Sequence, residues 1–224
     1  MNIKLHHGAL DIIKNLKLYD NRFINCCLLG ENQGILFKKE RYYPVNVEAY
    51  SKVSKLKSKE AFISILEVLR KLKETSMDIK LPNGSIYVTS LVYDYIYCEE
   101  DRKIHVNWNS KFIPLISGHM EAGKFLLADP RITNINSNKR YCLYLLIEKN
   151  LWQLCKQVTF VLPKDEIREM LNLQDYEYRE FKSLHAKVIK PTLVDIYNKL
   201  GVKLITSVRG NRVIFQYATD TLHA

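Results

Sequence analysis

The side chains that most clearly indicate a chemical role are cations in one segment with helical periodicity, Tyr178–Leu200. At about 100° per residue, one face of this segment carries basic and small side chains: Arg179, Lys182, Ser183, Ala186 and Lys190, with Lys187 at its border. The opposite face carries apolar side chains that would anchor it to a core: Phe181, Leu184 and Val188. A helix divided in this way fits a DNA major groove, which is about 12 Å wide. We therefore predict that the basic and small residues bind DNA; a solvated face on an amphipathic helix is the alternative.

A short turn downstream carries a second set of cations. The pattern predicts two strands, Val202–Val208 and Arg212–Tyr217, joined by a turn at residues 209–211. A Gly/Asn turn flanked by arginines suits contacts with phosphates or with the minor groove. We therefore expect Arg209, Asn211 and Arg212 to bind DNA next to the helix.

The overall charge supports a polyanionic partner. The chain has 224 residues with 34 Lys and Arg against 24 Asp and Glu, a net charge of +10. The segment Tyr176–Tyr217 alone has eight Lys and Arg against three acids, a net charge of +5, so half of the excess lies in under a fifth of the chain. A basic folded surface attracts nucleic acids, acidic proteins or anionic membranes. Charge alone does not choose among these partners.

Other features of the composition concern the cellular compartment. Every uncharged run is shorter than the ~20 residues that span a bilayer, and Met1–Leu10 lacks the apolar core of a signal peptide. The five cysteines form no CxxC pair, which favours reduced thiols. We expect a cytoplasmic protein without a membrane partner. Cys142 and Cys155 lie in apolar helical patterns and are expected to be core residues.

The sequence offers little support for catalysis. It contains no GxxxxGK[ST] phosphate loop and no HExxH metal motif. His105-Val106-Asn107 lacks the second histidine that the metal strand of a rolling-circle nickase needs. We therefore expect no enzyme activity, no metal and no cofactor. An unrecognised active site such as that of a nickase stays open, because any of 14 tyrosines could be a nucleophile.

The order of expected elements repeats in the two halves of the chain. The first half would contain a helix, a short strand, two helices and three strands: His7–Leu29, Ile35–Phe37, Asn46–Ser54, Ser58–Glu74, Met77–Leu81, Ile86–Cys98 and Lys103–Trp108. A connector with short helical pieces, Asn109–Ser137, would follow. The second half would then contain a helix, a strand and two helices, Asn138–Lys156, Val158–Leu162, Lys164–Asn172 and Tyr178–Leu200, followed by the two strands already named. Asn46 and Ser58 are expected helix caps. The pattern predicts an α+β fold of two tandem winged-helix domains, with an unrelated α+β fold as the alternative.

Several motifs together resemble the iteron-binding plasmid replication initiator family. Phe181-Lys182, Val188-Ile189-Lys190-Pro191 and Asp195-Ile196-Tyr197-Asn198 are similar to that family's reading helix, which a basic wing follows. Upstream, Asn138–Leu146 looks like a helix of the same family, and Phe62–Leu72 with Trp108–Leu115 looks like its first winged domain. The resemblance covers about residues 10–217. Its departures, at Asp195, Tyr197 and Cys142-Leu143, weaken any contact assigned near Arg140.

The resemblance implies a division of labour between two domains. Residues 1–117 would form an N-terminal winged-helix domain for dimerisation and phosphate contacts, and residues 118–224 a C-terminal one that reads the DNA sequence. The expected partner is double-stranded DNA with direct repeats, bound by a homodimer in equilibrium with monomer. Monomers of the family open a plasmid origin and recruit the host replication initiator and replicative helicase. The main alternative is a winged-helix transcriptional regulator, an autorepressor without replication activity.

Overall fold

The computed structural model describes residues 3–6, 9–28, 42–80, 83–110, 112, 125–128, 135–151 and 159–218. The chain divides into a first unit, residues 1–12 and 16–130, and a second unit, residues 13–15 and 131–224. The predicted domain boundary between residues 117 and 118 lies outside the described residues, as does the predicted strand Ile35–Phe37.

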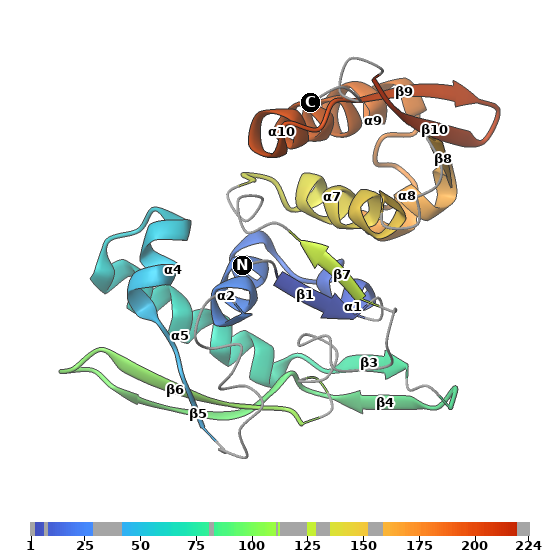
Figure 1. Ribbon diagram of the computed structural model, residues 1–224. Helices are drawn as coiled ribbons and strands as arrows, with labels where there is room; N and C mark the ends of the chain where they lie inside the picture. Colours follow the sequence, from blue (N-terminus) through green and yellow to red (C-terminus); the bar gives the residue numbers. More distant parts are fainter. Residues whose placement is uncertain are drawn as a thin grey trace. The chain divides into compact units, whose positions relative to one another are not determined.

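The first unit has the order of elements of a winged helix (Figure 1). Its described helices are α1 (Ala9–Ile13), α2 (Leu18–Leu28), α4 (Val47–Ser54) and α5 (Ser58–Glu74). Its three-stranded antiparallel sheet has the order β2 (Tyr43–Pro44), β6 (Lys103–Trp108) and β5 (Val92–Cys98). Two further antiparallel pairs are β3 (Met77–Lys80) with β4 (Ile86–Thr89), and β1 (Ile3–His6) with β7 (Phe125–Ala128). The elements therefore follow the predicted order, with additional strands.

The helices of the first unit begin and pack as their sequences dictate. The Asn46 side chain accepts a hydrogen bond from the Ala49 N–H at 2.9 Å, which confirms the predicted cap of α4. The predicted cap Ser58 is wrong: Lys57 is the N-cap of α5, and its N–H donates to the Glu60 carboxylate at 3.0 Å. The apolar stripe of α5 is buried: Ala61, Phe62, Ile65, Val68, Leu69 and Leu72.

The second unit repeats this topology. Its elements are α7 (Asn138–Leu151), β8 (Thr159–Pro163), α8 (Lys164–Met170), α9 (Phe181–Leu184), η3 (His185–Ile189), α10 (Lys190–Leu200), β9 (Leu204–Arg209) and β10 (Arg212–Tyr217). The strand order β8-β10-β9 corresponds to β2-β6-β5 of the first unit. Phe160 and Phe215 stack with their ring centroids 4.8 Å apart, which joins the β8–β10 pair to the core. The α+β prediction of two winged helices is confirmed.

Helix α7 is the central helix of the second unit. All seven side chains from Tyr141 to Ile147 are buried, as expected of a helix that is covered on every side. Burial raises the pKa of the Cys142 thiol to about 12, so this cysteine is a protonated core residue as predicted. Cys155 and the predicted end of this helix at Lys156 lie outside the described residues.

Three predicted elements of the first unit are interrupted. The single helix His7–Leu29 is wrong, because a turn separates α1 from α2 and the Asp20 carboxylate caps α2 through the Lys17 N–H at 2.8 Å. The single strand Ile86–Cys98 is also wrong, because residues 90 and 91 interrupt the strand conformation between β4 and β5. There the Leu91 N–H donates to the Leu72 carbonyl at 3.3 Å. The predicted connector contains the strand β7, whose pairing with β1 joins segments about 120 residues apart.

Within the described ranges, every helix is too short or too polar to cross a bilayer.

Candidate nucleic-acid interface

The segments α9, η3 and α10 form one continuous helix, Phe181–Leu200, here termed the basic helix. It ends at Leu200, as predicted, and the next residue, Gly201, has a left-handed φ of 73° that stops the helix. It begins at Phe181 rather than at Tyr178, because Tyr178 has a φ of 49° and so cannot belong to a right-handed helix. The predicted placement of Arg179 on the first helical turn is therefore wrong: Arg179 is exposed in the turn before the helix.

A π-helical turn in the middle of the basic helix sets which side is buried. The Lys190 N–H donates to the His185 carbonyl, five residues back, immediately before Pro191, which has no N–H to donate. Leu184 and Ile196 are both fully buried, although twelve residues of regular helix would leave them about 120° apart. One inserted residue removes about 100° of this difference. The π turn thus keeps one apolar side facing the core along the whole helix.

The other side of the basic helix carries most of the predicted DNA-binding residues. Lys182, Ala186, Lys187 and Lys190 are exposed, and Ser183 is half-buried among them. The predicted core positions Leu184 and Val188 are buried. Phe181, also predicted to face the core, is only half-buried. The structure therefore presents these cations and small side chains along one helix, as the pattern predicts.

The β9–β10 hairpin, here termed the basic wing, presents its arginines at the tip. Arg209 and Arg212 pair directly across the strands, and Gly210, at the first turn position, has a φ of 55° that suits glycine. Arg209, Asn211 and Arg212 are all exposed. Figure 1 shows this hairpin extending beyond the helices of its unit.

Two sets of hydrogen bonds hold the basic wing against the helices. The Asn211 side-chain amide donates to the Asp165 carboxylate at 2.9 Å, and the Asn211 carbonyl accepts from the Lys164 N–H at 3.0 Å. The His185 ring nitrogen Nε2 bonds to the Thr206 hydroxyl at 2.9 Å. The wing tip therefore has a fixed position next to the start of α8, and the strand β9 is tied to the basic helix.

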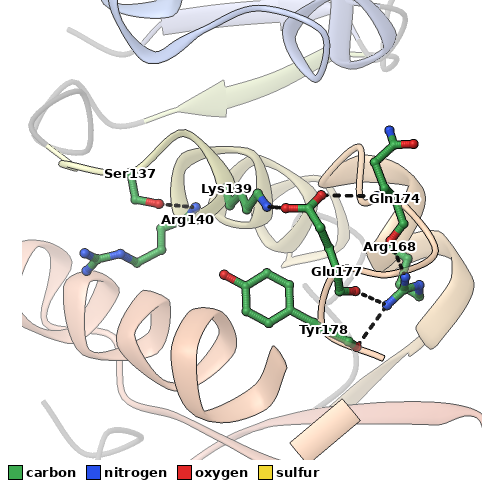
Figure 2. Close-up of polar contacts among 7 residues, drawn as sticks. All are labelled: Ser137, Lys139, Arg140, Arg168, Gln174, Glu177 and Tyr178. Atoms are coloured by element: carbon green, nitrogen blue, oxygen red, sulfur yellow. Dashed lines mark hydrogen bonds and ion pairs between the residues drawn. The ribbon is translucent and has the colours of Figure 1, made fainter. Parts of the chain in front are cut away.

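A guanidinium group fixes the turn between α8 and the basic helix (Figure 2). Arg168 donates from Nη1 to the carbonyls of Glu177 and Tyr178, each at 3.1 Å, and from Nη2 to the carbonyl of Gln174 at 3.0 Å. The Glu177 carboxylate accepts from the Gln174 N–H at 3.2 Å and forms an ion pair with Lys139. The Lys139 ammonium also lies 5.1 Å from the centroid of the Tyr178 ring.

Two acids of the basic segment are neutralised from α7. The Lys139 ammonium lowers the pKa of Glu177, chiefly through their hydrogen bond, so this carboxylate stays ionised and paired. Arg140 on α7 forms an ion pair with Asp195 on α10, with Nη1 and Oδ2 2.9 Å apart. Glu180 is the only other acid between residues 176 and 217, and the Asp165 carboxylate of α8 contacts the wing tip at Asn211. Within residues 176–217 cations outnumber acids eight to three, so the field of the helix and wing is positive on balance.

Sequence reasoning did not identify Arg168, Lys139 or Asp165 as part of this arrangement. Arg168 contacts carbonyls six to ten residues away, and Lys139 and Asp165 have partners 38 and 46 residues away. Such pairings leave no periodic signal in the sequence. These three side chains hold the basic helix and wing in position, and their own spacing in the sequence does not indicate that role.

The hairpin of the first unit has the opposite charge. Glu99, Glu100 and Asp101 lie at the exposed β5–β6 turn, and Asp101 forms an ion pair with Lys103 at 3.0 Å. Over residues 99–103 the three acids outnumber the two exposed cations by one, so this turn attracts phosphates less than the basic wing does. In the described part of the chain, no group of three or more His, Cys, Asp or Glu side chains is arranged to hold a metal ion.

Comparison with known proteins gives a structural likeness only. No family model and no curated protein matches the sequence. The crystal structure of the Pi initiator protein in complex with iteron DNA matches with a TM-score of 0.77 at 16% identity, over 96% of each chain. Domains 2 and 3 of RctB match with a TM-score of 0.50 at 13% identity, over 92% of this chain and 81% of that one. The fold is thus that of an iteron-binding initiator, as the sequence motifs indicate.

Proposed function

We propose that this chain is a plasmid-type replication initiator that binds repeated double-stranded DNA sites through its second unit. The main support is the combination of a whole-chain fold, shared with an initiator described in complex with iteron DNA, and a basic helix and basic wing on one unit. The acidic turn of the first unit favours the second unit as the one that reads sequence.

In this proposal the two basic features have different roles. The basic helix enters the major groove, where Lys182 reaches base edges and the small side chains of Ser183 and Ala186 allow close approach. Lys187 and Lys190 lie farther along the same helix and bind phosphates. Arg209 and Arg212 hold the backbone at the wing, and they position the protein without reading sequence.

The finer functions of an initiator are part of the same proposal. Binding to several repeats would promote opening of an adjacent origin, and the complex would recruit the host replication initiator and replicative helicase. The protein would act by binding alone, without cofactor or bond cleavage, in a bacterial cytoplasm on the plasmid or nucleoid.

We also propose that the first unit forms a homodimer in equilibrium with monomer. Its strands β4 and β5 expose apolar side chains, among them Ile86 at 58%, Val88 at 61% and Ile96 at 55%. An exposed apolar face of this kind is typical of protein interfaces. Sedimentation equilibrium should show that Val88→Glu shifts the population to monomer, whereas Val161→Glu, at an exposed valine of the second unit, should not.

A footprint on the DNA that adjoins the protein's own gene tests the proposal. We expect protection of tandem direct repeats of about twenty base pairs beside an A·T-rich tract. A single protected palindrome would instead indicate the transcriptional regulator. Cleavage that depends on a divalent metal would indicate a nickase and contradict the non-enzymatic mechanism.

A further inference from the structure

We propose that a groove between α10 and β9 binds an extended, acidic segment of a partner protein. The groove has a volume of about 450 Å³ and is lined from the helix by Leu193, Val194 and Tyr197, and from the strand by Leu204 and Ile205. Most of its lining from the helix comes from the second half of the basic helix, with His185 at one end, and Lys182 and Ala186 are not part of the lining.

Much of the exposed surface of the groove is apolar. The side chains of Val194, Tyr197 and Ile205 are exposed to 49%, 53% and 49%. Phosphates gain nothing from such a surface, whereas an apolar side chain gains about 25 cal/mol for each Å² that it buries. The occupant must therefore carry apolar side chains.

The charge of the groove selects an acidic occupant. Lys190 and Lys203 line it, and among the described residues that line it none is an Asp or Glu. The nearest acid of α10 along the sequence, Asp195, forms an ion pair with Arg140 on α7. Complementary charge would steer an acidic segment to this site and reject a basic one.

The strand β9 favours an extended segment over a helix. Among the described strands, β9 pairs with β10 alone, so it forms an outer edge of the sheet β8-β10-β9. In an antiparallel pair, alternate residues of an edge strand direct their backbone N–H and C=O groups away from the partner strand. A peptide laid between such an edge and a neighbouring helix adds a strand to the sheet, and its alternate side chains enter the groove.

Selection of random peptides of about twelve residues, displayed on phage, against the full-length chain tests this inference. We expect the selected peptides to combine Asp or Glu with apolar residues at alternate positions. Anisotropy of a labelled synthetic copy should show that Val194→Glu and Ile205→Glu each weaken binding at least about tenfold. Val161→Glu, at 46% exposure on the opposite edge strand β8, is the matched control and should leave peptide binding unchanged.

Affinity for a random DNA duplex separates this site from the DNA-binding surface. Both groove variants should weaken duplex binding no more than Val161→Glu does, because each adds the same charge. A selection without binders, a preference for basic peptides, or peptide binding that survives both folded groove variants would overturn the inference. A selective loss of duplex binding in the groove variants would also overturn it, because the groove would then belong to the DNA surface. Two separate groove variants guard against misfolding of either one, which circular dichroism would detect.

Discussion

Arg168 donates a hydrogen bond to the carbonyl of Tyr178 at 3.1 Å, at the residue whose φ of 49° turns the chain toward the basic helix. The same guanidinium also satisfies the carbonyls of Glu177 and Gln174. One side chain therefore sets where the basic helix begins and where Arg179 lies relative to it.

Replacing Arg168 should loosen this turn. Hydrogen bonds from a charged donor contribute about 1.5–3 kcal/mol when they are well formed, so Arg168→Met should lower the free energy of unfolding by about 1–3 kcal/mol. Arg168→Lys should recover only part, because an ammonium group lacks the planar fork that reaches three carbonyls. Urea unfolding measures both. Arg179→Met, at an exposed arginine of the same turn, is the control, and an equal loss there would contradict the role of Arg168.

The Lys139–Glu177 ion pair should make stability depend on pH in the acid range. The pKa of Glu177 is lowered from its ordinary value of 4.5, so the carboxylate stabilises the fold above that value. This stabilisation is lost as the pH falls through the lowered pKa, where the carboxylate takes up a proton. Wild type should be more stable than Glu177→Gln at neutral pH, and the difference should close in acid. Urea unfolding across this pH range that gives a constant difference would refute the ion pair's contribution.

Lys182 and Arg179 should differ in their effect on sequence preference. Lys182 lies on the exposed side of the first helical turn, so Lys182→Ala should cost about 1–3 kcal/mol on the cognate repeat and reduce the preference over random DNA. Arg179 precedes the helix, so Arg179→Ala should weaken both DNAs alike. Affinities for both duplexes measure this. Suppose that Lys182→Ala kept the preference for the cognate repeat, while Lys59→Ala on α5 of the first unit abolished it. Helix α5, and not the basic helix, would then read the DNA sequence.

Loss of a cation should weaken DNA binding at the basic wing but not at the hairpin of the first unit. Arg209→Ala or Arg212→Ala should weaken specific and random DNA alike and reduce the salt slope by about one unit. Lys103→Ala at the acidic hairpin of the first unit is the matched control, because Lys103 pairs with Asp101 there. A change of slope in Lys103→Ala as large as that in Arg209→Ala would argue against a special role for the basic wing.

The order of elements could be predicted because it depends on local periodicity. Helix α5 shows a continuous apolar stripe, and Gly201 marks the end of the basic helix. The breaks depend on distant contacts: the division of β4 from β5 rests on hydrogen bonds from Leu91 to Leu72 and from Asn109 to Ser90. Nothing near Ser90 in the sequence indicates those partners.

The same limit applies to the interface. The cations of the basic helix and wing were predictable from their spacing, since exposed faces follow from helical and strand periods. The π turn could not be predicted from the sequence, because it follows from the burial of both Leu184 and Ile196 in the tertiary structure. The start of the helix depends on Arg168, which lies on α8 and bonds to the turn. Hydrophobic periodicity in the sequence does not reveal a contact of this kind.

The dependence of DNA affinity on salt tests the central claim most directly, namely that the basic helix and basic wing of the second unit form a DNA-binding surface. If they neutralise about six phosphates, the logarithm of the binding constant should fall against the logarithm of the salt concentration with a slope near −5. A slope flatter than about −2 would contradict the account, because too few phosphates would then be contacted.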